Sequence, residues 1–297
     1  MLQLALRTLM SLALGTLVSG VRAEDVRRPD LLLTAADVKQ HLDDSVYRIL
    51  DVRAAAAYAT GHVPGAMSVD LPQWTKQSRN VAGLLDRDFW APAVGKLGID
   101  HQTRVLVYGA DAASAARAWW LLEFVGVKSV SLLDGGWRAW QAAGYPVATQ
   151  TPQREPRKFE PRFQRERLMD LAELLRGLDN PRLQVLDTRS RGEYTGQDVK
   201  GARAGRVPGA LHLEWVELLD ESGRFKQPAE LETLLAERGI KASGLVVTYC
   251  YSGGRASVAA FALELLGRPQ VKNYYCGWQE WSAAEQAPAQ TDAGTKK

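Results

Sequence analysis

Cys250 ends a short run of β-branched residues and begins a loop that holds two glycines and an arginine. The sequence from position 246 reads VVTYCYSGGRAS, and a helix-forming series follows over 256–266. This order places a thiol at the carboxyl end of a strand, near the positive end of a helix dipole and a permanently charged guanidinium. Such surroundings favour the thiolate, the nucleophilic form of cysteine. The alternative is a buried, inert cysteine, which the glycines and the arginine make a poor explanation.

The bulk composition bounds the class of protein. The chain has 297 residues, of which 46% are hydrophobic and 24% are charged, and its formal net charge is +3. This length suits two domains of ordinary size. A protein that binds nucleic acid or another polyanion needs a basic patch. The small net charge therefore argues against a protein of this class.

The N-terminal segment 1–23 has the pattern of a secretory signal peptide. It carries an early Arg7, an apolar core over 9–18 and small or apolar residues before Ala23, where we expect cleavage. The apolar core is too short to span a bilayer comfortably. A plain N-terminal helix is the alternative. We expect a periplasmic or secreted protein with no membrane partner after cleavage.

The cysteine and histidine content argues against a metal site. Only Cys250 and Cys276 are present, there is no CxxC pair, and the four histidines are scattered. Two cysteines can form one disulfide in an exported protein, but they do not make a disulfide scaffold. We therefore expect no metal.

The sequence repeats itself, and the repeat predicts the domain organisation. Three segments of the first half return in the second half: 48–66 as 184–210, 104–126 as 244–267, and 135–140 as 276–281. The first of these is eight residues longer in the second copy. Tyr108 and Tyr249 are 141 positions apart, so Cys250 corresponds to Gly109. The first copy therefore lacks the nucleophile.

Each copy alternates short apolar runs with amphipathic stretches. The predicted strands are 48–52, 105–108 and 129–133 in the first copy, and 184–187, 246–249 and 271–275 in the second. Helical stretches such as 115–125 and 228–238 separate them, which predicts an α/β fold with mostly parallel sheets covered by helices. We expect domains at 24–147 and 168–285, an exposed Pro-rich linker at 148–167, and a disordered tail at 286–297.

Both halves resemble rhodanese domains, and the whole chain resembles the tandem-domain rhodanese (thiosulfate/3-mercaptopyruvate sulfurtransferase) family. The resemblance rests on LDVR and LDTR, the HVPGA and RVPGA turns, the AARAWW run, CYSGGRAS, and GGWRAW with CGWQEW. These motifs come in the expected order and cover nearly all of the mature chain. The resemblance implies an inactive N-terminal domain, a catalytic C-terminal domain and a site in the cleft between them.

The resemblance also implies a cycle in which Cys250 carries sulfur as a covalent persulfide, with no bound cofactor. The backbone N–H groups of the loop can stabilise the anion, and the two glycines allow a tight turn. Arg255 can bind a sulfonate, or it can close the loop onto a carboxylate. The predicted binding residues are Tyr251, Ser252, Gly253, Gly254, Arg255 and Ala256. The C-x4-R spacing is one residue shorter than the C-x5-R of cysteine phosphatases, which favours sulfur over phosphate.

Asp187 and Arg189 follow a predicted strand, and the inactive copy keeps the pair as Asp51 and Arg53. Because both copies have it, we interpret the pair as an architectural, charge-assisted contact that closes a loop. We interpret the VPG segments as turns that shape the backbone. We interpret the tryptophans of both copies as residues that pack in the core or between the domains. Arg206 follows a glycine, and we interpret it as a surface residue without a role.

The identity of the sulfur donor is the least determined point. Glu193 and Ser252 stand where vertebrate thiosulfate-specific members carry basic residues, and Ser252 matches part of the CGSGVT loop of mercaptopyruvate-using relatives. Arg255 matches instead the CxSGxR loop of bacterial enzymes assigned to thiosulfate. We expect a monomer that moves sulfur from thiosulfate to a thiophilic acceptor, cyanide or a thiol. The alternatives are 3-mercaptopyruvate as donor, or a non-catalytic persulfide carrier.

Cys250 and Cys276 each follow a predicted strand, and the resemblance implies that these two strands are neighbours. Neighbouring strands are about 4.8 Å apart, and a disulfide needs Cα atoms about 4.4–6.8 Å apart. The loop must nevertheless turn Cys250 inward to meet its N–H groups, which directs its side chain away from Cys276. We therefore expect two free thiols.

Overall fold

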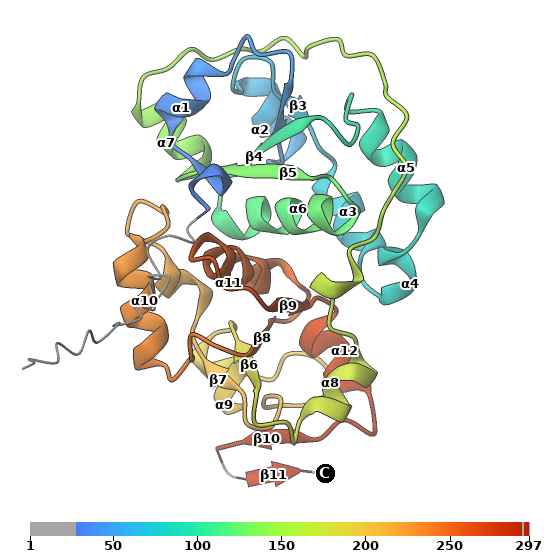
Figure 1. Cartoon of the computed structure of the whole chain (residues 1–297), viewed down its shortest axis with the longest axis vertical. Helices are drawn as coiled ribbons and strands as arrows, with labels where there is room; N and C mark the ends of the chain where they lie inside the picture. The colour runs from blue at the N-terminus through green and yellow to red at the C-terminus, as the bar shows by residue number, and fades with distance from the viewer. Residues whose placement is uncertain (1–27, 293, 297) are drawn as a thin grey trace, which may run out of the picture.

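The computed structural model describes residues 28–292 and 294–296, which form two α/β domains that lie one above the other in Figure 1. The secretory signal predicted at 1–23 lies outside the described residues. Within the described part of the chain, no helix is long and apolar enough to cross a membrane.

The first domain is built on a five-stranded sheet in which all neighbouring strands are parallel, in the order β1-β5-β4-β2-β3. Its strands are β1 (Leu32–Leu33), β2 (Tyr47–Asp51), β3 (Met67–Ser68), β4 (Arg104–Tyr108) and β5 (Ser129–Leu133). Its helices are η2 (Pro29–Leu31), α1 (Ala35–Gln40), α2 (Ala55–Thr60), α3 (Leu71–Gln77), α4 (Val81–Leu84), α5 (Arg87–Gly95), α6 (Ala112–Phe124) and α7 (Gly136–Ala142). Helices cover both faces, so the longer strands are almost wholly buried.

The second domain repeats this plan with a four-stranded parallel sheet in the order β7-β6-β8-β9. Its strands are β6 (Leu183–Asp187), β7 (Leu211–His212), β8 (Leu245–Tyr249) and β9 (Val271–Tyr274). Its helices are η3 (Arg165–Arg167), α8 (Leu171–Gly177), α9 (Arg191–Thr195), η4 (Trp215–Leu218), α10 (Pro228–Glu237), α11 (Gly254–Leu265) and α12 (Gly277–Ala283). The prediction of two tandem α/β domains with parallel sheets is confirmed.

The internal repeat extends to single hydrogen bonds. The carbonyl of Cys250 accepts from the backbone N–H of Trp278 at 2.7 Å, and the carbonyl of Gly109 accepts from Trp137 at 3.1 Å. Each bond ties the loop after β4 or β8 to the first turn of the domain's last helix, α7 or α12. The two loops are thus built alike, although only one of them holds a cysteine.

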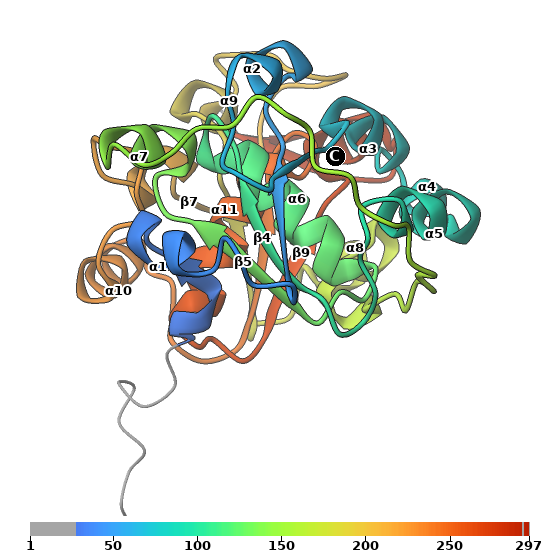
Figure 2. The same ribbon diagram turned by 90° about the horizontal axis from the view of Figure 1, so that it is seen from above.

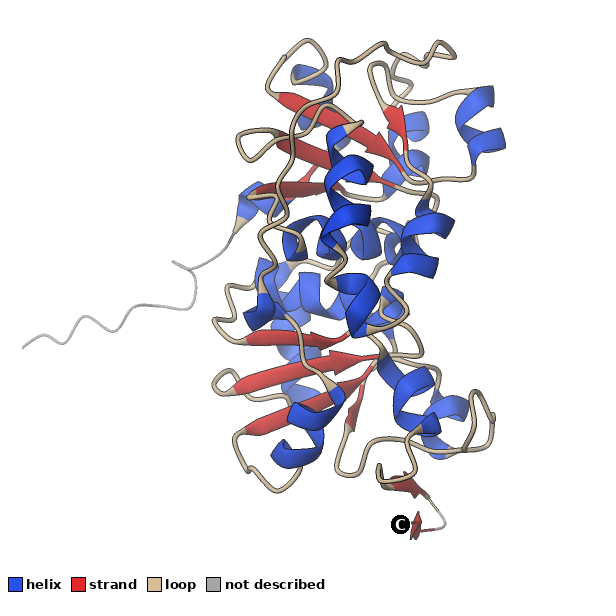
Figure 3. Ribbon diagram, turned by 90° about the vertical axis from the view of Figure 1, so that its right-hand side faces the viewer, coloured by secondary structure: helices blue, strands red, loops and turns tan. Residues whose placement is uncertain are grey.

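Helices α6 and α11, labelled in Figure 1, pack against each other and form the centre of the domain interface, and Figure 3 shows helices lying between the two sheets. Each helix contacts its own sheet on one side and the other helix on the opposite side, so it is apolar almost all round. Trp119 meets Phe261 edge to face at 4.9 Å, and Trp120 stacks on Tyr275 at 4.6 Å. These tryptophans therefore pack in the inter-domain core.

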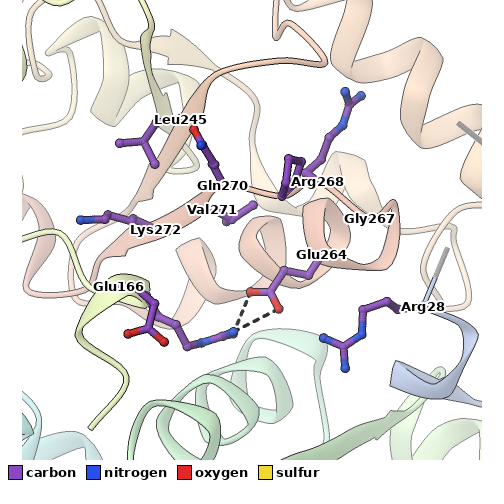
Figure 4. A pocket seen from close by; sticks show the side chains of 11 residues that line it. Arg28, Glu166, Leu245, Glu264, Gly267, Arg268, Gln270, Val271 and Lys272 are labelled. Atoms are coloured by element: carbon purple, nitrogen blue, oxygen red, sulfur yellow. Dashed lines mark hydrogen bonds and ion pairs between the residues drawn. The ribbon is translucent and has the colours of Figure 1, made fainter. Parts of the chain in front are cut away.

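One charged cluster interrupts this apolar interface. The Arg167 guanidinium lies 2.9 Å from the Glu123 carboxylate of α6 and 2.7 Å from the Glu264 carboxylate of α11. Figure 4 shows the bonds to Glu264 beside a cavity of about 630 Å³, with Arg28 on its far side. Burial raises the pKa of Glu123 to about 7; Glu264 adds to this effect, and Arg167 opposes it. One guanidinium is therefore shared by two largely buried carboxylates.

This cluster predicts a pH-dependent stability. Because folding favours protonated Glu123, its contribution to stability is present below about pH 4.5 and is lost as the pH rises through about 7. Glu123→Gln should therefore raise Tm at about pH 8.5 by roughly 2–4 °C for each kcal/mol recovered, and leave Tm almost unchanged at about pH 5. Thermal unfolding of both proteins at the two pH values checks this. Equal changes at both would contradict it.

The segment 148–167 passes from the first domain to the second along the outside of the first domain, as the view from above shows (Figure 2). Most of its side chains are exposed, but Phe159 is buried. The backbone N–H groups of Arg157 and Arg162 donate to the carbonyls of Gly95 and Val125 at 2.9 and 2.8 Å. The linker is therefore bonded to the domain that it leaves.

Two expectations for the C-terminal part are wrong. The tail was predicted to be disordered, but β10 (Ala289–Thr291) pairs with β11 (Gly294–Lys296), and Gln290 exchanges backbone bonds with Arg206 at 2.8 and 3.0 Å. Arg206 was predicted to lie on the surface, but its side chain is 9% exposed. It bonds the carbonyl of Tyr194 and the Asp292 carboxylate, because the tail covers it.

Candidate active site

Cys250 immediately follows β8, at the carboxyl edge of the second sheet, and is only 2% exposed. Helix α11 begins four residues later, and its N-cap residue, Gly253, offers no side-chain cap. In the first copy the matching helix α6 is capped by Asp111, whose carboxylate accepts from the backbone N–H of Ser114 at 2.8 Å. The position that corresponds to Asp111 is Ser252. In the second copy, therefore, no N-cap side chain is bonded to this helix N-terminus, where the helix dipole favours negative charge.

The two glycines of the loop are required by what packs against them. Gly253 has a φ of +86°, and a Cβ atom there would lie 2.5 Å from the Tyr275 ring. A Cβ atom at Gly254 would lie 2.7 Å from a guanidinium nitrogen of Arg117. The loop can therefore approach an aromatic ring and a cation only because these two positions carry no side chain.

The side chain of Arg255 is bonded to Glu193 of α9. Its two terminal nitrogens donate to the two carboxylate oxygens at 2.6 and 3.0 Å. Burial would raise the pKa of Glu193, but the bonds from Arg255 outweigh it and lower that pKa to about 2. Of the two roles that the sequence left open for Arg255, the structure shows the closure of the loop onto a carboxylate.

Asp187 and Arg189 form a buried ion pair of 2.6 Å beside the loop, and Arg189 also donates to the carbonyl of Gly205 at 2.7 Å. Tyr249 donates its hydroxyl to Asp187 and accepts from the N–H of Val207, which orders the VPG turn. The first domain repeats every one of these contacts with Asp51, Arg53, Gly61, Tyr108 and Val63. The pair is therefore part of the architecture in both copies.

The other predicted loop residues lie together around Cys250. Tyr251 is half-buried, and the Lys200 ammonium lies 5.2 Å from the centre of its ring. Ala256 is fully buried in the first turn of α11. Ser252 turns its carbonyl toward the first domain. Within the part of the chain that the structure describes, no three His, Cys, Asp or Glu side chains are grouped to hold a metal ion.

Sequence reasoning missed Arg117, a residue of α6 in the inactive domain. It donates to the carbonyl of Ser252 at 2.8 Å and to the phenol oxygen of Tyr275 at 2.9 Å. The Tyr275 hydroxyl also lies 3.2 Å from the Ser78 hydroxyl of the first domain. A signal was present in the sequence: Arg117 is the only cation in the helix AASAARAWWLLEF.

Comparison with known proteins identifies the family. The rhodanese-like domain matches the chain twice, over residues 34–143 and 170–284. The chain belongs to the rhodanese family.

Several rhodanese relatives are similar over most of the chain. The sulfur carrier protein TtuD of Thermus thermophilus is 33% identical, over 85% of this chain and 94% of that protein. The thiosulfate sulfurtransferase of Rattus norvegicus is 32% identical, over 84% and 86%, and the 3-mercaptopyruvate sulfurtransferase of Escherichia coli K12 is 30% identical, over 84% and 94%. A solved structure of EanB/Y353A with ergothioneine superposes with a TM-score of 0.80 at 25% identity, over 92% of this chain and 72% of that one. This protein is accordingly a member of a sulfurtransferase family.

The second cysteine of this rhodanese lies outside the Cys250 loop. Cys276 follows β9, which pairs with β8, and both thiols are free and buried. Burial raises the pKa of Cys276 to about 12, and the nearby Glu280 carboxylate adds to this effect. A thiol with so high a pKa is neutral at physiological pH and a poor nucleophile.

Replacing Cys276 should therefore leave sulfur transfer intact. Cys276→Ala is expected to keep activity within about twofold, because its counterpart in the inactive copy is Gly135 and no step needs a second thiol. Steady-state assays of both proteins test this. In the wild-type protein, iodoacetamide at about pH 8 should label Cys250 and not Cys276. Loss of activity in Cys276→Ala with an unchanged Tm would contradict the assignment.

Proposed function

We propose that this rhodanese is a thiosulfate sulfurtransferase that carries sulfane sulfur on Cys250. One observation carries the proposal. Cys250 stands in front of an uncapped helix N-terminus, where the inactive copy has Gly109 and an aspartate cap. The site therefore offers a nucleophilic sulfur together with a place for an anion, and the other copy offers neither.

The cycle has two displacement steps. In the first, the Cys250 thiolate attacks the outer sulfur of thiosulfate, the sulfur–sulfur bond of the donor breaks, and sulfite leaves with its electron pair. The cysteine then carries a persulfide anion. In the second, cyanide or a thiolate attacks the terminal sulfur, and the Cys250 thiolate leaves. No proton, metal or external oxidant is needed in either step.

The preference for thiosulfate is supported by the cationic character of the site. The Arg117 guanidinium bonds the loop at the Ser252 carbonyl and is in none of the ion pairs of the described residues, and Arg255 belongs to the same loop, although it is paired with Glu193. A dianion gains more from such a site than the singly charged 3-mercaptopyruvate does. Curated relatives carry both names, so the two donors must be compared directly.

A comparison of the two donors with cyanide as acceptor tests the proposal. We expect kcat/KM for thiosulfate to exceed that for 3-mercaptopyruvate under the same conditions. A higher kcat/KM for 3-mercaptopyruvate would overturn the assignment of thiosulfate as the donor, but sulfur transfer through Cys250 would still stand. No turnover with either donor would overturn the proposal that the protein is an enzyme for small-molecule donors.

A sulfur carrier is the second candidate, favoured by the 33% identity to the protein named sulfur carrier TtuD. A carrier would load one sulfur on Cys250 and pass it to a partner without repeated turnover. Loading with thiosulfate, followed by mass spectrometry and a steady-state assay with cyanide, separates the two. Stoichiometric loading without turnover would favour the carrier.

A further inference from the structure

The cations near Cys250 differ in whether a carboxylate is paired with them. Arg255 from α11 is paired with Glu193 from α9, and Arg189 is paired with Asp187. Burial raises the pKa of the neighbouring Tyr275 phenol, so that group is neutral at physiological pH. Two cations remain next to the loop: the exposed Lys200, whose ammonium lies 5.2 Å from the centre of the Tyr251 ring, and the half-buried Arg117 guanidinium.

Arg117 has no carboxylate partner of its own. Among the residues that the structure describes, none of the ion pairs includes it, and its bonds go to the Ser252 carbonyl and the Tyr275 phenol. Asp111, at the start of the same helix, attracts it only from beyond ion-pair distance and is bonded to Ser114. A half-buried cation with neutral bonding partners is costly unless an anion lies nearby.

The thiol of Cys250 belongs to the same loop. Arg117 contacts Ser252 and Gly254, the second and fourth residues after the cysteine. Burial opposes the charge on Arg117, but the Tyr275 oxygen and the Cys250 sulfur raise the pKa of its guanidinium above the ordinary value. The cation is thus held against the loop by two bonds and attracted by the sulfur.

We propose that Arg117 of the inactive domain is the counter-ion of Cys250 in both resting states of the cycle, thiolate and persulfide. The inference rests on the persulfide cycle proposed above. Thiolate and thiosulfate carry the same total charge as persulfide and sulfite, so the cysteine bears one negative charge throughout. A single fixed cation matches this constant charge. Arg117 is therefore a positioning residue. The cation of this ion pair comes from the first domain, and the anion, Cys250, comes from the second.

Two substitutions separate the charge of Arg117 from its bonds. Arg117→Gln can still donate to the Ser252 carbonyl and the Tyr275 phenol but is neutral, whereas Arg117→Lys keeps the charge. The rate of alkylation of Cys250 by iodoacetamide, measured against pH in the Cys276→Ala background, reports the thiolate. We expect Gln to move the midpoint of this profile upward by at least about one pH unit, and Lys to leave it within roughly half a unit. At neutral pH, kcat/KM for thiosulfate should fall about 10- to 100-fold in the Gln variant, and less in the Lys variant.

Arg138→Ala is the matched control. Arg138 is an exposed arginine of the first domain, and it also bonds a carbonyl of the second, that of Glu221 at 3.4 Å. Its removal should leave the alkylation profile unchanged, and thermal unfolding shows whether each variant is folded. The counter-ion role is overturned if both the Gln and the Lys variant keep the wild-type midpoint of the alkylation profile. It is also overturned if the midpoint shifts by the same amount in both variants. Because alkylation needs no sulfur donor, the test stands even if thiosulfate is not turned over, which would overturn only the proposed donor.

Discussion

Cys250→Ser is expected to abolish sulfur transfer, with a loss of more than about 10³-fold in kcat and little change in Tm. A serine hydroxyl is not ionised at neutral pH and cannot hold a persulfide sulfur. The side chain is 2% exposed and ends a strand, so an oxygen in place of sulfur should disturb the packing little. The measurement is the steady-state rate with thiosulfate and cyanide, together with thermal unfolding.

Mass spectrometry sharpens this prediction. After incubation with thiosulfate alone, the wild-type protein should gain the mass of one sulfur atom, on the peptide that contains Cys250. The Cys250→Ser variant should gain none, and Cys276→Ala should gain as much as the wild type. Appreciable turnover or loading in the serine variant would show that another group carries the sulfur.

The second large effect is expected at the ion pair between Arg255 and Glu193. Arg255→Ala should raise KM for thiosulfate about 10- to 100-fold, the loss of one charge-assisted contact of ~1.5–3 kcal/mol. It also leaves the Glu193 carboxylate, whose side chain is 7% exposed, without its partner beside the loop. Glu193→Gln should have the opposite effect and lower KM about 3- to 10-fold, because it releases the guanidinium toward the donor.

The double variant Arg255→Ala/Glu193→Gln separates the two contributions. It should regain the stability that Arg255→Ala loses, because no carboxylate is left unpaired, and it should keep the raised KM. If the double variant regains the wild-type KM, Arg255 acts only by neutralising Glu193. Steady-state kinetics and thermal unfolding of the three variants give the full comparison.

The pKa of Glu193 determines the pH range over which the ion pair with Arg255 contributes to stability. A carboxyl group whose pKa falls to about 2 in the folded protein contributes stability above its ordinary pKa, and the contribution is lost as the pH falls toward about 2. The ion pair is therefore complete at neutral pH. Changes in activity near neutral pH should therefore not come from this ion pair.

Much of the fold follows from the local sequence. The apolar runs that predict strands at 48–52 and 246–249 end within one residue of β2 and β8, because buried parallel strands need continuous aliphatic side chains. The repeat identifies two domains, and its alignment shows that Gly109 takes the place of Cys250. The cysteine and the loop glycines lie within one short segment, and the Asp–Arg pair of LDTR lies within another. Residues so close together in sequence can be recognised from their local chemistry alone.

Tertiary structure alone decided which charges the site contains. Arg117 and Ser252 are 135 positions apart, Ser78 and Tyr275 are 197 apart, and Arg255 reaches a carboxylate 62 positions away. No periodicity or spacing links such residues, since they meet only when α6 packs on α11 and the two sheets take their places. The burial of Arg206 under the C-terminal tail has the same origin, because a residue is covered by whatever the fold places on it. The sequence by itself identified the two domains and predicted Cys250 as the nucleophile, whereas the packing between the domains placed Arg117 against the loop of that cysteine.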